Sequence, residues 1–245
     1  MPKYRAIFIH PFKAGGTSVS DYLCKYYDDS AATTDSISFL KEKKNKAQLI
    51  RGHISAMDAP PGYKKLTIIR NPEAQLMSAL WHTMTHSADN LNHLPFNKSR
   101  DLIKHAREVW MSEKNSYNVT GVLYGSQSSF FALPWKKRGC DALETISRFN
   151  VVGITERMDD SLRIMAWRLC LPPPQTKYHA RSSQAGHHPM PDEIRQVLLP
   201  HLSKDTLLYN RANDIFEKDF QRLVYFVGSD RHQDIDAFLM ERSKV

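Results

Sequence analysis

The stretch from Arg5 to Leu23 reads RAIFIHPFKAGGTSVSDYL and predicts a strand, a tight loop and the start of a helix. Its apolar run, Ala6 to Ile9, is typical of a buried strand. The loop that follows carries Lys13 and two glycines, and a Thr-Ser pair then opens a helix-compatible segment. At such a junction backbone N–H groups point outward and attract phosphate or sulfate. An ordinary turn, in which the glycines only ease the backbone, is the alternative.

Composition describes a globular chain with an excess of positive charge. Of its 245 residues, 41% are hydrophobic and 24% are charged, which suits one domain over residues 1–245 with a sizeable core. The formal net charge of +8 favours anionic partners, such as nucleotides, other polyanions, nucleic acid or an anionic surface. The charge alone does not choose among them.

The cysteines and the apolar segments predict a cytoplasmic protein. The three cysteines are widely spaced and lack metal-ligand spacing, which is typical of a reduced compartment. No apolar run approaches the ~20 residues that span a bilayer. The chain passes directly into its first predicted strand, without room for a signal peptide. We therefore expect no membrane partner.

Apolar runs and helical periodicity alternate along the chain. Strands are predicted over residues 6–9, 47–50, 66–69 and 151–154, with a loop over 28–38. Helices are predicted over residues 16–27, 72–86, 98–114, 142–148, 156–171, 192–202, 204–223 and 229–243. Asn71 and Thr155 are well suited to cap the helices that follow them. The alternation predicts one α/β domain with a mostly parallel sheet.

Basic and titratable side chains follow three of the predicted strands. Lys13, His53 and Arg70 stand just after these strands, at the ends where open α/β sheets bind their ligands. Arg70 has forked donors that suit phosphate, and Ser78 lies two turns along the next helix, so this pair could hold a second anionic group. A surface ion pair for Arg70 and an ordinary helix-face hydroxyl for Ser78 are the alternatives.

The first loop differs from the phosphate-binding loop of NTPases. That motif places its lysine directly before the Ser or Thr at the helix start, whereas Lys13 precedes both glycines. A kinase also needs a carboxylate for magnesium, typically at the end of a neighbouring strand, where this chain has Arg70. The pattern favours phosphate binding by the chain's own cations, and we expect no metal site.

Four segments resemble the sulfotransferases that use 3′-phosphoadenosine 5′-phosphosulfate (PAPS), in the carbohydrate branch that includes heparan sulfate 2-O-sulfotransferase. Residues 8–18, FIHPFKAGGTS, resemble that family's 5′-phosphosulfate loop, and residues 69–79, IRNPEAQLMSA, its 3′-phosphate segment. Residues 151–162 and 205–216 are similar to two later blocks. The resemblance implies a P-loop-kinase-like three-layer fold and transfer of a sulfuryl group to a hydroxyl, most plausibly on a glycan.

The resemblance also implies a role for each matched residue. Lys13 would neutralise charge on the bridging oxygen, and His53 would take the proton from the acceptor hydroxyl, for which a neutral imidazole is suited near neutral pH. Arg70 and Ser78 would bind the 3′-phosphate. The donor's 5′-phosphosulfate would be held by Lys13, Ala14, Gly15, Gly16, Thr17 and Ser18. Further contacts with PAPS, or with its product 3′-phosphoadenosine 5′-phosphate (PAP), would come from Arg181 and Ser182, unless these lie in a plain solvated loop.

Several positions depart from the family's pattern. The proline of the first loop stands one place early, which is expected to alter the path of the loop. Arg51 stands where the 2-O-sulfotransferases have a second histidine. The other departures are Ala14 for Thr or Ser, Asn71 for Asp and Gln75 for Arg.

Two other functions stay open. A P-loop-type kinase would phosphorylate a small molecule with magnesium and ATP. A non-catalytic polyanion binder would keep the basic surface without needing Lys13 or His53. We expect a hydroxyl-bearing acceptor, rather than nucleic acid, as the partner.

Overall fold

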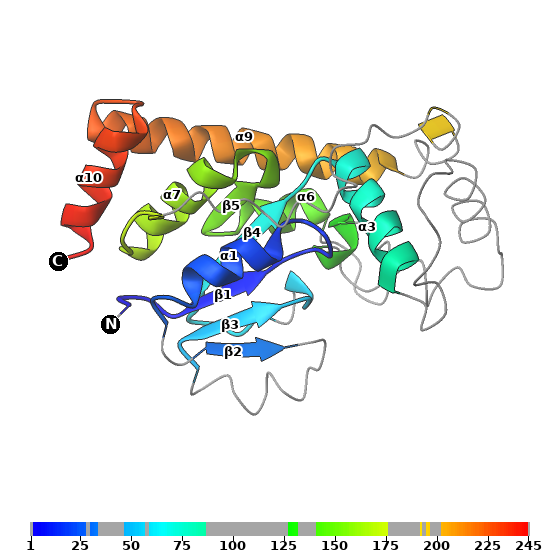
Figure 1. The fold of residues 1–245 in the computed structure, drawn as a ribbon, viewed down its shortest axis with the longest axis horizontal. Helices are drawn as coiled ribbons and strands as arrows, with labels where there is room; N and C mark the ends of the chain where they lie inside the picture. Colours follow the sequence, from blue (N-terminus) through cyan, green and yellow to red (C-terminus); the bar gives the residue numbers. More distant parts are fainter. Residues whose placement is uncertain are drawn as a thin grey trace.

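A sheet of five parallel strands forms the centre of the molecule (Figure 1). The computed structural model describes residues 2–27, 30–33, 47–56, 59–86, 127–131, 141–175, 192, 195, 196 and 202–244. The strand order is β2-β3-β1-β4-β5. The strands are β1 (Ala6–Ile9), β2 (Ser30–Thr33), β3 (Leu49–Gly52), β4 (Lys64–Ile69) and β5 (Val151–Ile154). The predicted α/β class with a mostly parallel sheet is therefore confirmed.

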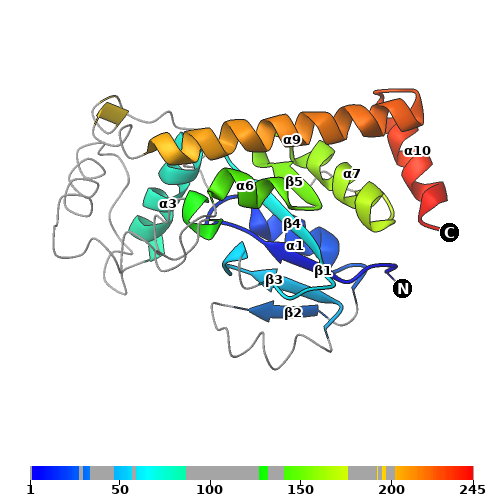
Figure 2. The ribbon, with the colours of Figure 1, turned by 180° about the vertical axis from the view of Figure 1, so that it is seen from behind.

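Helices lie on both faces of this sheet. Figure 1 shows α1 in front of the strands, and Figure 2, from behind, shows α6 on the opposite face, with α9 running across the molecule above β5 and α7. The α-helices are α1 (Gly16–Leu23), α3 (Pro72–His86), α6 (Ala142–Ser147), α7 (Met158–Leu169), α9 (Ser203–Val227) and α10 (His232–Arg242). Two short 3₁₀ helices, η3 (Gln127–Phe130) and η4 (Thr155–Arg157), complete the described elements.

The core is centred on β1, whose four residues are completely buried. A strand with neighbours on both sides and helices over the sheet has no face for polar side chains, which explains its unbroken apolar run. Val19, Tyr22 and Leu23 of α1 pack into the same core. These residues recur at helical spacing and line the inner face of α1.

The predicted elements agree with the structure where the local signal is strong. The first and last predicted strands have the bounds of β1 and β5, and α3 begins at Pro72 as predicted. The predicted loop over 28–38 is wrong in part, because Ser30–Thr33 forms edge strand β2. Helix α1 ends at Leu23, four residues earlier than predicted. The predicted helix over 98–114 lies outside the described residues, as does most of that over 192–202.

Within the described parts of the chain, no helix combines the length and apolar character that crossing a membrane requires.

Candidate functional site

The loop between β1 and α1 has an irregular backbone. Lys13 has a φ of 60°, in the left-handed region, although it has a side chain. Gly15 has a φ of 87° and is the N-cap of α1, where it provides no side-chain cap. The first N–H groups of a helix have no partner within it, and those of α1 begin at Gly16. Left-handed residues beside a helix start are typical of loops that bind an anion through backbone N–H groups.

Three consecutive carbonyl groups of this loop accept hydrogen bonds from side chains elsewhere in the fold. Gln75 Nε2 donates to the Phe12 carbonyl at 2.8 Å. Arg70 Nη1 donates to the next carbonyl, that of Lys13, at 3.1 Å. Thr155 Oγ1 donates to the Ala14 carbonyl at 2.6 Å. Side chains that follow β4 and β5 therefore set the orientation of the peptide planes after β1.

The orientation of these carbonyls decides where the N–H groups point. In a trans peptide plane the C=O of one residue and the N–H of the next point in opposite directions. The N–H groups of Lys13 and Gly15 are thus turned away from the side chains that hold the loop, as a cradle for an anion requires. The intervening N–H, of Ala14, instead donates to the Pro11 carbonyl at 3.3 Å. Ala14 is fully buried, so its side chain supports the loop.

His53, which follows β3, lies against this loop. Its Nδ1 is 2.9 Å from the His10 carbonyl oxygen. A carbonyl only accepts hydrogen bonds, so Nδ1 carries the hydrogen, and in the neutral ring Nε2 then carries the lone pair. This is the tautomer that a general base needs, with Nε2 as the basic atom.

An aromatic cluster surrounds His53. Its ring centroid lies 4.3 Å from that of His10 and 5.5 Å from that of Phe12. Burial, followed by the nearby His53, lowers the pKa of His10 to about 3. The ring of His10 also stacks on Phe8, and its buried Nδ1 has no hydrogen-bond partner among the described residues. His10 is therefore neutral near pH 7, so it places no second positive charge beside His53.

Lys13 and Arg70 bring two positive charges together at the loop. Burial lowers the pKa of Lys13, and the charge of Arg70 lowers it further. The pKa of Arg70 is also lowered by burial, against the opposing effect of Glu156. Neighbouring cations that have lost part of their hydration are stabilised by an anion bound beside them. The electrostatics of the loop therefore favour an anionic ligand.

The main chain of Arg70 is fixed on both sides by one residue. Gln127 accepts from the Arg70 N–H at 2.9 Å and donates to its carbonyl at 2.7 Å. The backbone of η3 is held in turn, because the N–H groups of Gln127 and Ser128 donate to the Asp205 carboxylate at 2.8 and 2.9 Å. Nothing in the local sequence around Gln127 indicates this role.

Thr155 and Glu156 follow β5 at the same edge of the sheet. The prediction that Thr155 caps the next helix is wrong: its hydroxyl donates to the first loop, and α7 begins only at Met158 without a side-chain cap. Glu156 accepts from the Asn71 N–H at 3.0 Å and from the Tyr209 hydroxyl at 3.3 Å. Both residues carry the signal that singles out Arg70, a polar side chain just after a strand.

The predicted site residues have different environments. The structure brings Lys13 and Arg70 together through the bond to the Lys13 carbonyl, and places His53 against the same loop. Thr17 is exposed, whereas Ser18 is buried, and Ser78 is only 3% exposed. Arg181 and Ser182 lie outside the described residues.

In the portion of the chain that the structure describes, no cluster of three or more His, Cys, Asp and Glu side chains has metal-binding geometry. Comparison of the chain with known protein families gives no match, and comparison with curated protein sequences gives none.

Proposed function

We propose that this protein is a cytoplasmic, PAPS-dependent sulfotransferase with a P-loop-kinase-like fold, and that it sulfates a hydroxyl on a carbohydrate. The observation that carries the proposal is the loop after β1, whose carbonyls are held by Gln75, Arg70 and Thr155. Its outward N–H groups, Lys13 and the neighbouring Arg70 suit a ligand with two anionic groups. His53 adds a base with the required tautomer.

In this proposal Lys13 and His53 act at opposite ends of one in-line transfer. His53 Nε2 takes the proton of the acceptor hydroxyl while that oxygen forms its bond to sulfur. The bond between sulfur and the 5′-phosphate oxygen breaks, and its electron pair stays on that oxygen. The Lys13 ammonium and the N–H groups of the loop stabilise this charge. Positioning and charge stabilisation supply most of the rate.

Arg70 would hold the 3′-phosphate. One of its five N–H donors binds the Lys13 carbonyl, and its main chain is fixed by Gln127. A guanidinium held in this way loses little conformational freedom when it binds phosphate. Ser78, on the following helix, remains the predicted second contact.

A thermal-unfolding comparison tests the donor site. PAP is expected to raise the midpoint of unfolding, because a ligand that binds only the folded state stabilises it. ATP with magnesium is the matched ligand for a kinase. Stabilisation by ATP with magnesium and not by PAP would favour the kinase and end the sulfotransferase proposal.

Transfer of radiolabelled sulfate from PAPS to a panel of desulfated glycosaminoglycans tests the chemistry. We expect Lys13→Ala and His53→Ala each to lower the rate by roughly 100-fold or more, in the range for one oxyanion donor or one general base. Lys218→Ala and His232→Ala, at exposed positions of α9 and α10, are the matched controls and should keep the wild-type rate. Full activity in both loop variants would contradict the catalytic assignment.

A further inference from the structure

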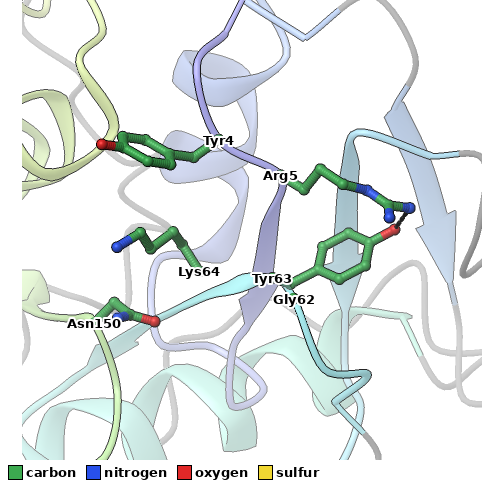
Figure 3. A pocket seen from close by; sticks show the side chains of 6 residues that line it. All are labelled: Tyr4, Arg5, Gly62, Tyr63, Lys64 and Asn150. Carbon is green, nitrogen blue, oxygen red and sulfur yellow. Dashed lines mark hydrogen bonds between the residues drawn. The ribbon is translucent and has the colours of Figure 1, made fainter.

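A pocket lies at the opposite, amino-terminal edge of the sheet (Figure 3). Its volume is about 280 Å³, and it is lined by Tyr4, Arg5, Gly62, Tyr63, Lys64 and Asn150. Lys64 begins β4 and Arg70 follows it, so at about 3.3 Å per residue the two are roughly 20 Å apart along the strand. The pocket is therefore separate from the candidate site, and binding there is independent of the proposed function.

One wall of the pocket presents hydrogen-bond donors. The Lys64 ammonium lies 4.9 Å from the centroid of the Tyr4 ring and forms no ion pair within the described residues. Asn150 Oδ1 accepts from the Lys65 N–H at 2.8 Å, so its NH₂ group is the part of the amide left for a ligand. Figure 3 shows the polar ends of Tyr4 and Lys64 turned to the same side of β1, with Asn150 near Lys64.

On the other side of β1, the side chains of Arg5 and Tyr63 are fixed against each other (Figure 3). The Arg5 guanidinium carbon lies 4.3 Å from the centroid of the Tyr63 ring, and its Nη2 donates to the Tyr63 hydroxyl and, at 3.2 Å, to the Ala47 carbonyl. The Tyr63 hydroxyl also donates to that carbonyl, at 2.7 Å. Gly62, with a φ of 84°, has no neighbouring atom within 4 Å of where a Cβ would stand, so the pocket is open at this residue.

We propose that this pocket binds an anionic saccharide through a sulfate ester or a carboxylate on one sugar ring. None of the lining residues is acidic, whereas Lys64 is cationic and Tyr4 and Asn150 add neutral donors on the same side of β1. Charge-assisted hydrogen bonds from such a wall select an oxyanion. The partly exposed Tyr4 ring offers an amphipathic surface suited to the C–H face of a sugar. The volume is at the lower limit of ligand pockets, which fits one sugar unit rather than a nucleotide.

Titration followed by NMR tests this assignment with four probes: glucose 6-sulfate, glucuronate, glucose and inorganic sulfate. We expect both anionic sugars to shift the amide signals of Gly62, Lys64 and Asn150. Glucose and inorganic sulfate should bind at least about tenfold more weakly, because glucose lacks the anionic group and inorganic sulfate lacks the sugar ring. Inorganic sulfate that binds as tightly as glucose 6-sulfate would overturn the saccharide assignment.

Lys64→Gln should weaken binding of glucose 6-sulfate by about tenfold or more, which is the effect of losing one charge-assisted bond. Lys65→Gln is the matched control, because successive side chains of a strand point to opposite faces. Lys13→Ala should also leave this binding unchanged, which separates the pocket from the candidate active site. Tyr4→Phe removes only a hydroxyl, so it is the second variant for this binding measurement if Lys64→Gln fails to fold. Wild-type affinity in both Lys64→Gln and Tyr4→Phe, or equal losses in Lys64→Gln and Lys65→Gln, would overturn the proposal.

Discussion

Two helices begin at the same edge of the sheet, and their first turns are built differently. Helix α3 is closed by its own residues: Asn71 Oδ1 accepts from the Ala74 N–H at 3.1 Å, and the Asn71 carbonyl accepts from the Gln75 N–H at 2.8 Å. Helix α1 has Gly15 as its N-cap and no side-chain cap bond. When the N-cap side chain of a helix accepts bonds from the first N–H groups, those groups stabilise the helix itself. When the N-cap has no such side chain, the first N–H groups are available to a ligand.

The capped start of α3, which we call the closed start, supports the uncapped start of α1, which we call the open start. Arg70 and Gln75, on either side of the α3 cap, provide two of the side chains that hold the carbonyls after β1. The cap fixes the first turn of α3, and this turn fixes Gln75 against the loop of α1. Single substitutions can alter one of the two helix starts at a time. The affinity for PAP then reports on the open start at α1.

Gly16→Ala is expected to have the largest effect. An alanine Cβ at this position would lie 2.2 Å from His10 Nδ1, so the ring or the helix must move. Helix propensity alone would favour alanine by about 1 kcal/mol, whereas overpacking costs about 1–3 kcal/mol. We expect urea denaturation to show a net loss of up to about 2 kcal/mol in the free energy of unfolding, together with weaker PAP binding.

Gly228→Ala is the control for Gly16→Ala. Unlike Gly16, this residue has a left-handed backbone, with a φ of 74°, and no atom lies within 4 Å of its Cβ position. It should lose only about 1 kcal/mol and keep its affinity for PAP. A Gly16→Ala variant at least as stable as wild type would show that His10 does not pack on the start of α1 as described.

Low pH should destabilise the folded protein, because the His10 ring that packs beside the open start does not take up a proton as readily as it does in the unfolded chain. Its pKa is about 3 in the folded chain and 6.5 ordinarily, so below pH 6.5 the unfolded state binds a proton that the folded state does not. The free energy of unfolding therefore falls as the pH drops from 6.5 to about 3, by up to about 2 kcal/mol near pH 5. Denaturation at a series of pH values should show a shallower slope in His10→Phe than in the wild type, with Gln221→Met, which removes no titratable group, as the control. An unchanged slope in His10→Phe would exclude His10 as its source.

Gln75→Met removes the donor to the Phe12 carbonyl and keeps the length of the side chain. Gln75 is 1% exposed, so the carbonyl loses a partner that water does not readily replace. We expect a loss of about 1–2 kcal/mol in stability and about tenfold in PAP affinity, measured by calorimetry. Gln221→Met, at an exposed position on α9, should change neither. Wild-type affinity for PAP in Gln75→Met would mean that the loop keeps its shape without this bond.

Asn71→Ala is expected to have the smallest effect. It removes the cap bond to the Ala74 N–H and should lower stability by about 1 kcal/mol. Asn71→Asp keeps a cap acceptor and should restore most of that loss. The affinity for PAP should stay near the wild-type value, because this helix start binds no ligand in our proposal. A loss of affinity as large as that in Gln75→Met would contradict the division between the two helix starts.

The sequence predicts those parts of the fold that local interactions decide. The apolar run of β1 and the Asn-Pro start of α3 are local signals, and both elements begin where they are predicted. Strand β2 has the sequence SAAT, which lacks a run of large apolar residues, and it forms by pairing with β3. Strand β2 therefore depends on its pairing with β3, which cannot be recognised from the residues around Ser30–Thr33 alone.

The same distinction applies to the candidate site. A polar side chain after a strand end is a local signal, and it singles out Lys13, His53 and Arg70. What such a side chain binds is decided by tertiary structure: Thr155 has the sequence context of a helix cap, but its hydroxyl binds a carbonyl of the first loop. Gln75 likewise looks like an ordinary helix residue until its contact with Phe12 is seen.

The bonds that shape the loop after β1 also bear on the order of folding. They join residues 57, 63 and 141 positions apart in the chain. Contacts between such distant residues form only after large loops have closed, so the loop takes its final shape when β4 and β5 are already beside β1. An anion that binds this loop therefore recognises the completed sheet. It should slow unfolding while leaving the rate of refolding nearly unchanged.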